Sequence, residues 1–244
     1  MRISHRYKFV FVSIPRTGST SVRNCLKPYS DIFSCGDRFS PYYHHIWARD
    51  LKHHFQEQAW EWDSFFKFAF VRNPWDRLVS LYHFGKPDRK LRYTWDLARW
   101  DPSTALSFED WIIALAQARQ KPRFLRQVDQ ITDANGMLLL DFVGRLENIN
   151  RDAKKVFERI GIREEVPVVN RTEHRHYSEY YTGRALSLVQ EFCRTDIEMF
   201  GYRFEKPTTC RCALRRIRDK ASAFLSGRRS REASARASRD AGRA

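Results

Sequence analysis

One apolar stretch followed by a polar loop constrains this chain more than any other feature. Residues 8–14 are almost entirely apolar and β-prone, without the polar alternation of a half-exposed strand. Such a run predicts a central strand of a parallel sheet that is covered on both faces. Residues 15–21 then contain a proline, a glycine and four hydroxyl side chains, and apolar residues recur after them at helical spacing. We therefore expect a strand, a tight loop and the N-terminus of a helix.

A loop of this kind has a specific chemistry. It brings together the unpaired N–H groups and the positive end of the dipole at the start of a helix, and these groups bind phosphate or sulfate. Arg16 adds a fixed positive charge, and hydroxyl groups follow it. We expect an anion to bind to the whole loop, which consists of Arg16, Thr17, Gly18, Ser19, Thr20 and Ser21.

A second unit of the same type begins with the apolar run at residues 65–71. Asn73 after it is a good N-cap, and Pro74 suits the first position of a helix. Arg72 then stands at the C-terminal end of a strand, where open α/β sheets bind their ligands. Ser80 shares a helix face with Asn73. We expect Arg72 and Ser80 to form a second anion anchor, and two anchors on different strands suit a ligand with phosphates at two ends.

The remaining pattern predicts the fold class. We expect a single α/β domain over residues 1–206, with a P-loop-like central parallel sheet and helices on both faces. Its third strand is expected at residues 137–143. Further helices are expected at residues 44–55, after a capping box at 107–110, after an N-cap at Asn150, and at residues 183–200.

Charge and cysteine content limit the partners and the compartment. Of the formal net charge of +15, residues 206–244 carry +9, from 12 basic and 3 acidic side chains. The remainder is only moderately basic, which favours an anionic ligand over specific nucleic-acid binding. The five cysteines form no Cys-x-x-Cys pair, and neither a signal peptide nor a membrane span is evident. We expect a cytoplasmic protein whose tail, residues 207–244, is disordered or rests as a basic amphipathic helix on an anionic membrane.

Two other kinds of site fit less well. A nucleoside-triphosphate P-loop, as in a kinase, needs an earlier glycine and a lysine directly after the second one, and both are missing around Gly18. The histidine pairs at 44/45, 53/54 and 174/176 suggest a metal at first sight. Neighbouring helical side chains point apart, however, and no cysteine or carboxylate completes a recognisable spacing. We expect no metal.

The motifs resemble a known family. Residues 14–21 (IPRTGSTS) resemble the 5′-phosphosulfate loop of sulfotransferases that use 3′-phosphoadenosine 5′-phosphosulfate (PAPS). Residues 68–82 (FAFVRNPWDRLVSLY) closely resemble the 3′-phosphate motif of these enzymes. Residues 141–148 and 196–202 resemble later blocks of the carbohydrate-type branch, which includes Golgi and bacterial members. The resemblance spans about residues 8–204.

The resemblance implies an activity and a donor. PAPS would supply a sulfuryl group for in-line transfer to a hydroxyl group, mainly through positioning and charge stabilisation. The loop from Arg16 to Ser21 would hold the 5′-phosphosulfate, and Arg72 with Ser80 the 3′-phosphate. Relatives usually carry lysine in place of Arg16. Arginine still neutralises charge on the departing oxygen, but it does not readily give up a proton.

The same resemblance implies a general base and a class of acceptor. A base must take the proton of the acceptor hydroxyl, and a neutral imidazole titrates in a suitable range. His45 aligns best with the histidine that the family places before a short helix, and His44 aligns second. The aromatic residues Tyr93, Trp95 and Trp100 stand beside basic residues, which favours a carbohydrate or glycolipid acceptor.

A function of a different class is also compatible with the sequence. A non-catalytic basic module would bind nucleic acid or an acidic polymer through its tail. The two interpretations differ in their ligand, because only a sulfotransferase needs Arg72 to bind adenosine 3′,5′-bisphosphate (PAP).

Overall fold

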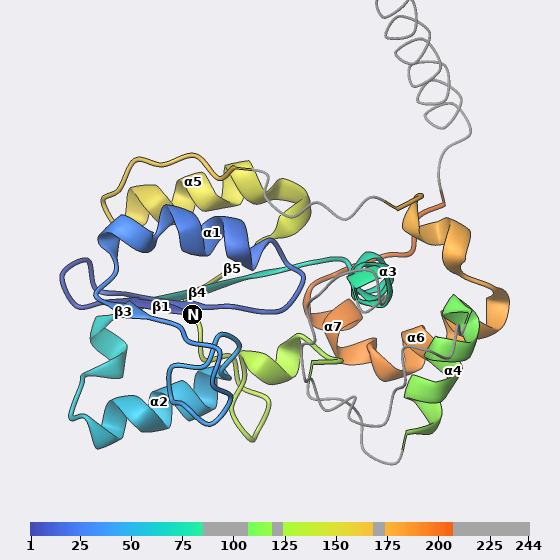
Figure 1. Ribbon diagram of the computed structural model, residues 1–244, viewed down its shortest axis with the longest axis horizontal. Helices are drawn as coiled ribbons and strands as arrows, with labels where there is room; N and C mark the ends of the chain where they lie inside the picture. The colour runs from blue at the N-terminus through green and yellow to red at the C-terminus, as the bar shows by residue number, and fades with distance from the viewer. Residues whose placement is uncertain (85–106, 119–123, 168–173, 207–244) are drawn as a thin grey trace, which may run out of the picture. The chain divides into compact units, whose positions relative to one another are not determined.

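The computed structural model describes residues 1–84, 107–118, 124–167 and 174–206. Contacts between Cα atoms divide the chain into two units, Met1–Phe204 and Glu205–Ala244, and all helices and strands below belong to the first. A five-stranded sheet with the order β3-β1-β2-β4-β5 forms its centre (Figure 1). The strands are β1 Arg2–Ser4, β2 Phe9–Val12, β3 Ile32–Phe33, β4 Phe66–Val71 and β5 Phe142–Arg145.

β2 is the central strand, as its continuous apolar sequence predicts. It pairs in parallel with β4, which pairs in parallel with β5, so the expected parallel sheet is confirmed for these three strands. β1 and β3 differ, because β1 pairs antiparallel with both β2 and β3. Only residues 5–8 separate β1 from β2, and a parallel pair needs a much longer crossover connection. The sheet is therefore mixed, with an antiparallel edge that the sequence pattern did not reveal.

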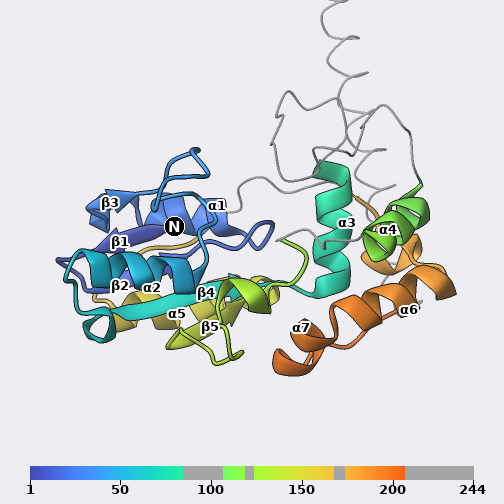
Figure 2. The ribbon, with the colours of Figure 1, turned by 90° about the horizontal axis from the view of Figure 1, so that it is seen from below.

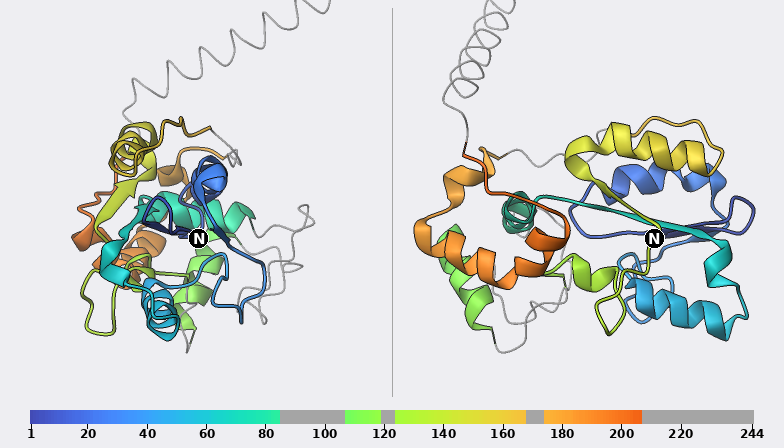
Figure 3. Two further views of the ribbon diagram at one scale, coloured as in Figure 1. Left: turned by 90° about the vertical axis from the view of Figure 1, so that its left-hand side faces the viewer. Right: turned by 180° about the vertical axis from the view of Figure 1, so that it is seen from behind.

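Two layers of helices cover the sheet. Successive side chains of a strand point to opposite faces. Phenylalanines of β2 and β4 pack on one face with α1 (Ser19–Cys25) and α5 (Ile149–Arg159). The alternate residues of these strands face α2 (Ala48–Glu57) on the other side. Figures 1 and 3 show α1 and α5 together on one side of the sheet and α2 on the opposite side, as expected for this fold class.

The other helices, α3 (Pro74–Phe84), α4 (Phe108–Gln117), α6 (Gly183–Phe192) and α7 (Arg194–Met199), lie beyond the end of β4 (Figure 2). Two of the three predicted N-caps are confirmed. The Asn73 Oδ1 atom accepts hydrogen bonds from the backbone N–H groups of Trp75 and Asp76, at 3.0 and 3.3 Å. The Ser107 Oγ atom accepts one from the N–H of Asp110 at 3.1 Å. These caps fix where α3 and α4 begin.

The third strand was predicted too early. It covers residues 142–145, and the preceding apolar residues form a turn and a single bridge between Thr132 and Leu138. The Asp133 carboxylate accepts from the N–H groups of Asn135 and Met137, at 2.9 and 2.8 Å, which holds this turn. The leucines at 138–140 gave the strand signal, yet Leu138 is 45% exposed. A run of leucines can lie in a strand or in a turn of which only one end is buried, and hydrophobicity alone did not distinguish these two structures.

Three helix predictions also need correction. α2 begins at Ala48 rather than at residue 44, and α5 begins at Ile149, so Asn150 lies inside the helix instead of capping it. The expected single helix over residues 183–200 is divided at Cys193 into α6 and α7. The division matters for the interior, because α7 carries Asp196 into a fully buried position.

Two of the predicted features lie on residues that the structure does not describe. The aromatic residues Tyr93, Trp95 and Trp100 and the basic tail at 207–244 lie outside the described residues. Within the described residues, no helix combines the length and the apolar character that crossing a membrane requires.

Candidate functional site

The loop after β2 has an unusual backbone. Arg16 has a φ of 66° and Gly18 a φ of 76°, both in the left-handed region. Glycine adopts this conformation readily, whereas an arginine there is strained. The Thr17 hydroxyl donates to the carbonyl oxygen of Ile14 at 3.0 Å, which closes the loop on the end of the strand. Strain of this kind persists only where the surrounding structure holds it, and it is often found at functional sites.

The loop leads directly into α1, as the sequence predicts. Ser19, Thr20 and Ser21 form the first turn of that helix, with Gly18 as the N-cap residue. Thr17, Ser19 and Ser21 are buried, while Thr20 is half-buried and accepts a hydrogen bond from Arg23 Nη2 at 3.3 Å. Thr20 is therefore the hydroxyl of this group that is best placed to reach a ligand at the surface.

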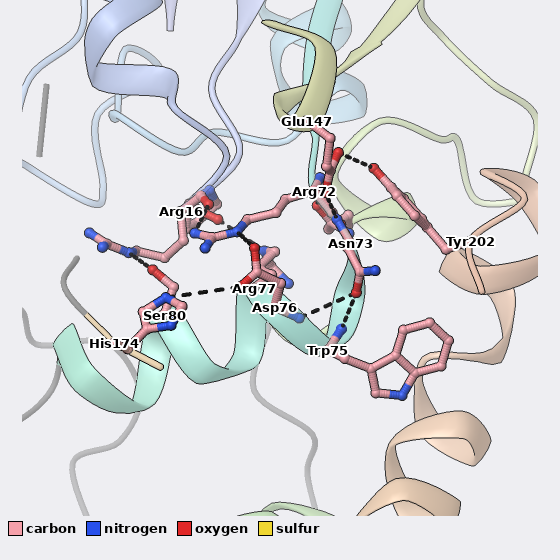
Figure 4. A network of polar contacts seen from close by, with 12 residues as sticks. Arg16, Arg72, Asn73, Trp75, Asp76, Arg77, Ser80, Glu147, His174 and Tyr202 are labelled. Carbon is pink, nitrogen blue, oxygen red and sulfur yellow. Dashed lines mark hydrogen bonds and ion pairs between the residues drawn. The ribbon is translucent and has the colours of Figure 1, made fainter. Parts of the chain in front are cut away.

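Arg72 lies at the end of β4 and turns toward the same loop. Its Nε atom donates to Asp76 Oδ2 at 2.8 Å, one helical turn further on, and its Nη1 atom donates to the carbonyl oxygen of Arg16 at 3.2 Å. Figure 4 shows the Arg72 side chain extended from the start of α3 to the Arg16 backbone. The two predicted anchors therefore meet at the carboxyl ends of the neighbouring strands β2 and β4.

Arg16 makes the reciprocal connection. Its Nε atom donates to the buried Ser80 hydroxyl at 3.0 Å, and its guanidinium lies 4.3 Å from the centre of the Phe84 ring (Figure 4). The sequence groups Ser80 with Arg72 as one anchor, and in this structure the Ser80 hydroxyl accepts a hydrogen bond from Arg16. Arg16, Arg72 and Ser80 consequently form one connected cluster rather than two separate anchors.

His45 comes to the same strand end from a different part of the chain. Its Nδ1 atom lies 2.6 Å from the carbonyl oxygen of Ser13, the residue that follows β2. A carbonyl only accepts, so the proton is assigned to Nδ1, and Nε2 then carries the lone pair. Burial lowers the pKa of His45 to about 3, which keeps the imidazole neutral at physiological pH. At neutral pH, Nε2 therefore carries a lone pair that can accept a proton.

His44 has a different setting. Its Nδ1 atom lies 2.7 Å from the Ser34 hydroxyl, and burial together with the positive charge of Arg23 lowers its pKa to about 4. The Ser34 hydroxyl also accepts from Arg2 Nη1 at 3.3 Å. His44 thus belongs to a group on β1 and the segment after β3, and His45 is the histidine whose ring contacts the strand end beside Arg16.

A buried arginine supports the loop, and sequence reasoning misplaced it. Helical spacing predicts that Arg77 shares a face with Asn73 and Ser80, opposite the apolar stripe of α3, but it is buried with the core residues. Its Nε atom donates to the carbonyl of Pro15 at 2.9 Å, and its terminal nitrogens donate to the carbonyls of Leu125 and Phe124. Burial lowers the pKa of Arg77 to about 10, so it stays charged at neutral pH.

Sequence reasoning also missed two acidic side chains at the site. Glu147 accepts from the backbone N–H of Asn73 and, at 3.1 Å, from the Tyr202 hydroxyl. Asp76 stands four residues after Arg72, and that spacing could have indicated an ion pair. Glu147 lies in the block at residues 141–148, but no local spacing indicates its role, because its partners are more than fifty residues away. Asp76 pairs with the Arg72 guanidinium, and Glu147 holds the main chain of the next residue, Asn73.

The histidines outside the cluster form contacts of another kind. The rings of His83 and His174 stack at 5.7 Å, and His83 Nε2 lies 2.9 Å from the Tyr180 hydroxyl. His174 Nε2 lies 3.9 Å from Asp76. In the part of the chain that the structure describes, no three histidine, cysteine or acidic side chains come together in a way that could hold a metal ion.

Comparison with known proteins gives the family. An uncharacterised protein of Archaeoglobus fulgidus is 30% identical over 108 residues, which cover 43% of this chain and 76% of that protein. The solved structure of mouse sulfotransferase SULT7A1 complexed with PAP matches with a TM-score of 0.43 and 12% identity, over 86% of this chain and 89% of that one. The model of the sulfotransferase family matches residues 1–203, essentially the whole first unit. The chain therefore belongs to the sulfotransferase family.

Proposed function

We propose that this protein transfers the sulfuryl group of PAPS to a hydroxyl group of a carbohydrate or glycolipid. Membership of the sulfotransferase family supports the reaction class. The observation that carries the proposal is the hydrogen bond from Arg72 Nη1 to the Arg16 carbonyl, at 3.2 Å. It holds the Arg72 guanidinium against the main chain of Arg16, so two positively charged residues lie at neighbouring strand ends, where a doubly phosphorylated nucleotide needs them.

This cluster supports the donor-binding roles that the family resemblance implies. The loop from Arg16 to Ser21 holds the 5′-phosphosulfate, and Arg72 with Ser80 holds the 3′-phosphate. Arginine suits both positions, because its guanidinium stays charged and can bind phosphate oxygens in pairs. The carboxylate of Asp76 pairs with Arg72 at 2.8 Å and keeps its side chain extended toward the loop.

The proposed chemistry needs only the donor, the acceptor and the protein. The acceptor oxygen attacks sulfur in line, a new O–S bond forms, and the bond from sulfur to the bridging phosphate oxygen breaks. His45 takes the hydroxyl proton on Nε2, and PAP leaves with the electron pair of the broken bond. Arg16 stabilises the negative charge that develops on the bridging oxygen. The bond from Nδ1 to the Ser13 carbonyl supports this role by orienting the ring.

The acceptor class rests on sequence. Residues 141–148 and 196–202 resemble blocks of the carbohydrate-type branch, and they contain groups of the site region, Glu147 and Tyr202. Transfer of labelled sulfate from PAPS to panels of glycans, glycolipids and tyrosine peptides tests this assignment. We expect labelled glycan or glycolipid; labelling of peptides alone would contradict the acceptor class but not the reaction.

Binding of PAP tests the donor site separately. We expect Arg72→Ala to abolish measurable PAP binding in calorimetry, and Arg6→Ala to leave the affinity within about twofold, since Arg6 contacts the Tyr7 ring at the opposite end of β2. Unchanged PAP affinity in Arg72→Ala would overturn the proposed donor site. It would instead favour a basic module that binds acidic polymers without using Arg72.

A further inference from the structure

Gln127 makes an unusual pair of hydrogen bonds with the main chain of Arg72. Its Oε1 atom accepts from the Arg72 N–H at 2.9 Å, and its Nε2 atom donates to the Arg72 carbonyl at 2.8 Å. We call these two contacts the Gln127 bridge. Arg72 stands one residue past the end of β4, and its N–H and carbonyl groups are not part of the strand pairing in this sheet. The Gln127 side-chain amide satisfies both groups instead.

Asp196 determines which way the Gln127 amide faces. Its Oδ2 atom accepts from the Gln127 backbone N–H at 2.9 Å and from Gln127 Nε2 at 3.2 Å, and its Oδ1 atom accepts from the Val128 N–H at 2.8 Å. A carboxylate only accepts, so the amide nitrogen must face Asp196 and the amide oxygen must face the Arg72 N–H. Gln127 and Asp196 are both fully buried, which makes these bonds costly to lose.

The same segment also reaches the first anchor. Leu125 and Phe124 accept hydrogen bonds from Arg77, which in turn donates to the Pro15 carbonyl beside Arg16. Residues 124–128 therefore contact the end of β4 through Gln127 and the loop after β2 through Arg77. A shift of this segment would change the position of both arginines relative to each other. Displacements of about 1 Å at such sites have large effects on binding and rate.

From this geometry we infer that Gln127 is a positioning residue for the donor site, oriented by Asp196. It fixes the main chain of Arg72 so that the guanidinium reaches the Arg16 carbonyl and stays available to the 3′-phosphate of the nucleotide. This inference rests on the proposed function, because it takes Arg72 as the phosphate anchor. Gln127 does not touch the nucleotide itself; it acts through Arg72.

A matched control is available on the next turn of the chain. Gln130 is the last residue of the short helix Val128–Gln130, which Gln127 precedes as the N-cap residue, and it is also buried, at 2% exposure. Its Nε2 atom has no hydrogen-bond partner, and it has no contact with Arg72 among the hydrogen bonds of the described residues. Gln130→Met thus introduces the same chemical change three residues away without touching the Gln127 bridge.

The test measures PAP affinity by calorimetry on the full chain, below the unfolding temperature of each variant. We expect Gln127→Met to weaken PAP binding about tenfold and Gln130→Met to change it less than twofold. Gln127→Asn keeps the amide but shortens its reach by one methylene group, and it should show an intermediate loss. If Gln127→Met does not fold, Gln127→Asn provides the test of PAP affinity instead. Equal affinities for wild type and either folded Gln127 variant would overturn the inference.

A double-mutant cycle separates positioning from general stability. In an Arg72→Lys background, whose weakened binding remains measurable, Gln127→Met should cost little further affinity, because the guanidinium that it positions is already gone. The same further tenfold loss in that background would show that Gln127 acts independently of Arg72 and would contradict the inference. If Arg72→Ala alone leaves PAP affinity unchanged, the proposed donor site fails, which is a distinguishable result.

Discussion

The Arg72 guanidinium donates from Nη1 to the Arg16 carbonyl at 3.2 Å, while the Arg16 side chain donates from Nε to the hydroxyl of Ser80 on the helix that follows Arg72. Each arginine thus donates a hydrogen bond to the other strand–loop–helix unit. Because these contacts are reciprocal, a substitution at one anchor should change the position of the side chain at the other.

Ser80 should contribute to binding at the 3′-phosphate end. We expect Ser80→Ala to weaken PAP binding about tenfold, because a hydrogen bond to a charged group contributes roughly 1.5–3 kcal/mol. Adenosine 5′-monophosphate lacks the 3′-phosphate, so its affinity in competition calorimetry should change less than twofold. An equal loss for both nucleotides would show that Ser80 acts through Arg16 at the 5′ end instead.

His45 should govern the chemical step rather than donor binding. We expect His45→Gln to lower kcat at least a hundredfold, in the range typical of a lost general base, with PAP affinity within about twofold. His53→Gln is a suitable control, since that side chain is 73% exposed and pairs with Glu57. A kcat close to that of wild type would remove His45 from the mechanism and leave His44 as the candidate.

The pH profile gives a second test of the same residue. Burial lowers the pKa of His45 to about 3, and the base is active in its neutral form, which predominates above that pKa. The value of kcat/KM should therefore stay level as the pH falls from 7 to 5, where an ordinary histidine of pKa 6.5 would already be protonated. An acidic limb near pH 6.5 that is absent in His45→Gln would contradict the buried, neutral state.

Much of this site could be predicted because its signals are local. A continuous apolar run indicates a buried strand whichever partner it meets, and Asn73 followed by Pro74 marks the start of a helix through contacts within the same turn. Arg72 directly follows such a strand, and Arg16 lies near the end of another. The topology of a parallel sheet was therefore enough to bring them to one edge.

The supporting groups could not be predicted in this way. Gln127 contacts Arg72 across 55 positions in sequence, and Asp196 contacts Gln127 across 69. A glutamine before Val128 and an aspartate in a helix look like ordinary surface residues, and only tertiary packing buries them. The antiparallel edge was missed for a related reason, because β1 and β3 are too short to show a period.

Gly18 should tolerate no side chain. Its φ is 76°, and an added Cβ would lie 2.7 Å from Leu146 Cδ1 and 3.1 Å from Ile149 Cδ1. We expect Gly18→Ala to lower the free energy of unfolding by about 2–4 kcal/mol, from left-handed strain and overpacking together. Gly136→Ala is the matched control, since its φ is 79° but nothing lies within 4 Å of the added carbon. Equal losses for the two variants in urea unfolding would show that strain alone matters.

Arg77 should be required for folding stability, independently of any ligand. It is buried, and its guanidinium donates to the carbonyls of Pro15, Leu125 and Phe124. Arg77→Met would leave these acceptors and the nearby buried Asp196 without their cation, so we expect a loss of about 3–5 kcal/mol in urea unfolding. Arg126→Met removes an exposed ion pair with Asp129, at 2.9 Å, and should change stability by less than about 1 kcal/mol. A loss for Arg77→Met no larger than that of Arg126→Met would mean that water or neighbouring groups replace the guanidinium, and that the loop after β2 is held by its own backbone.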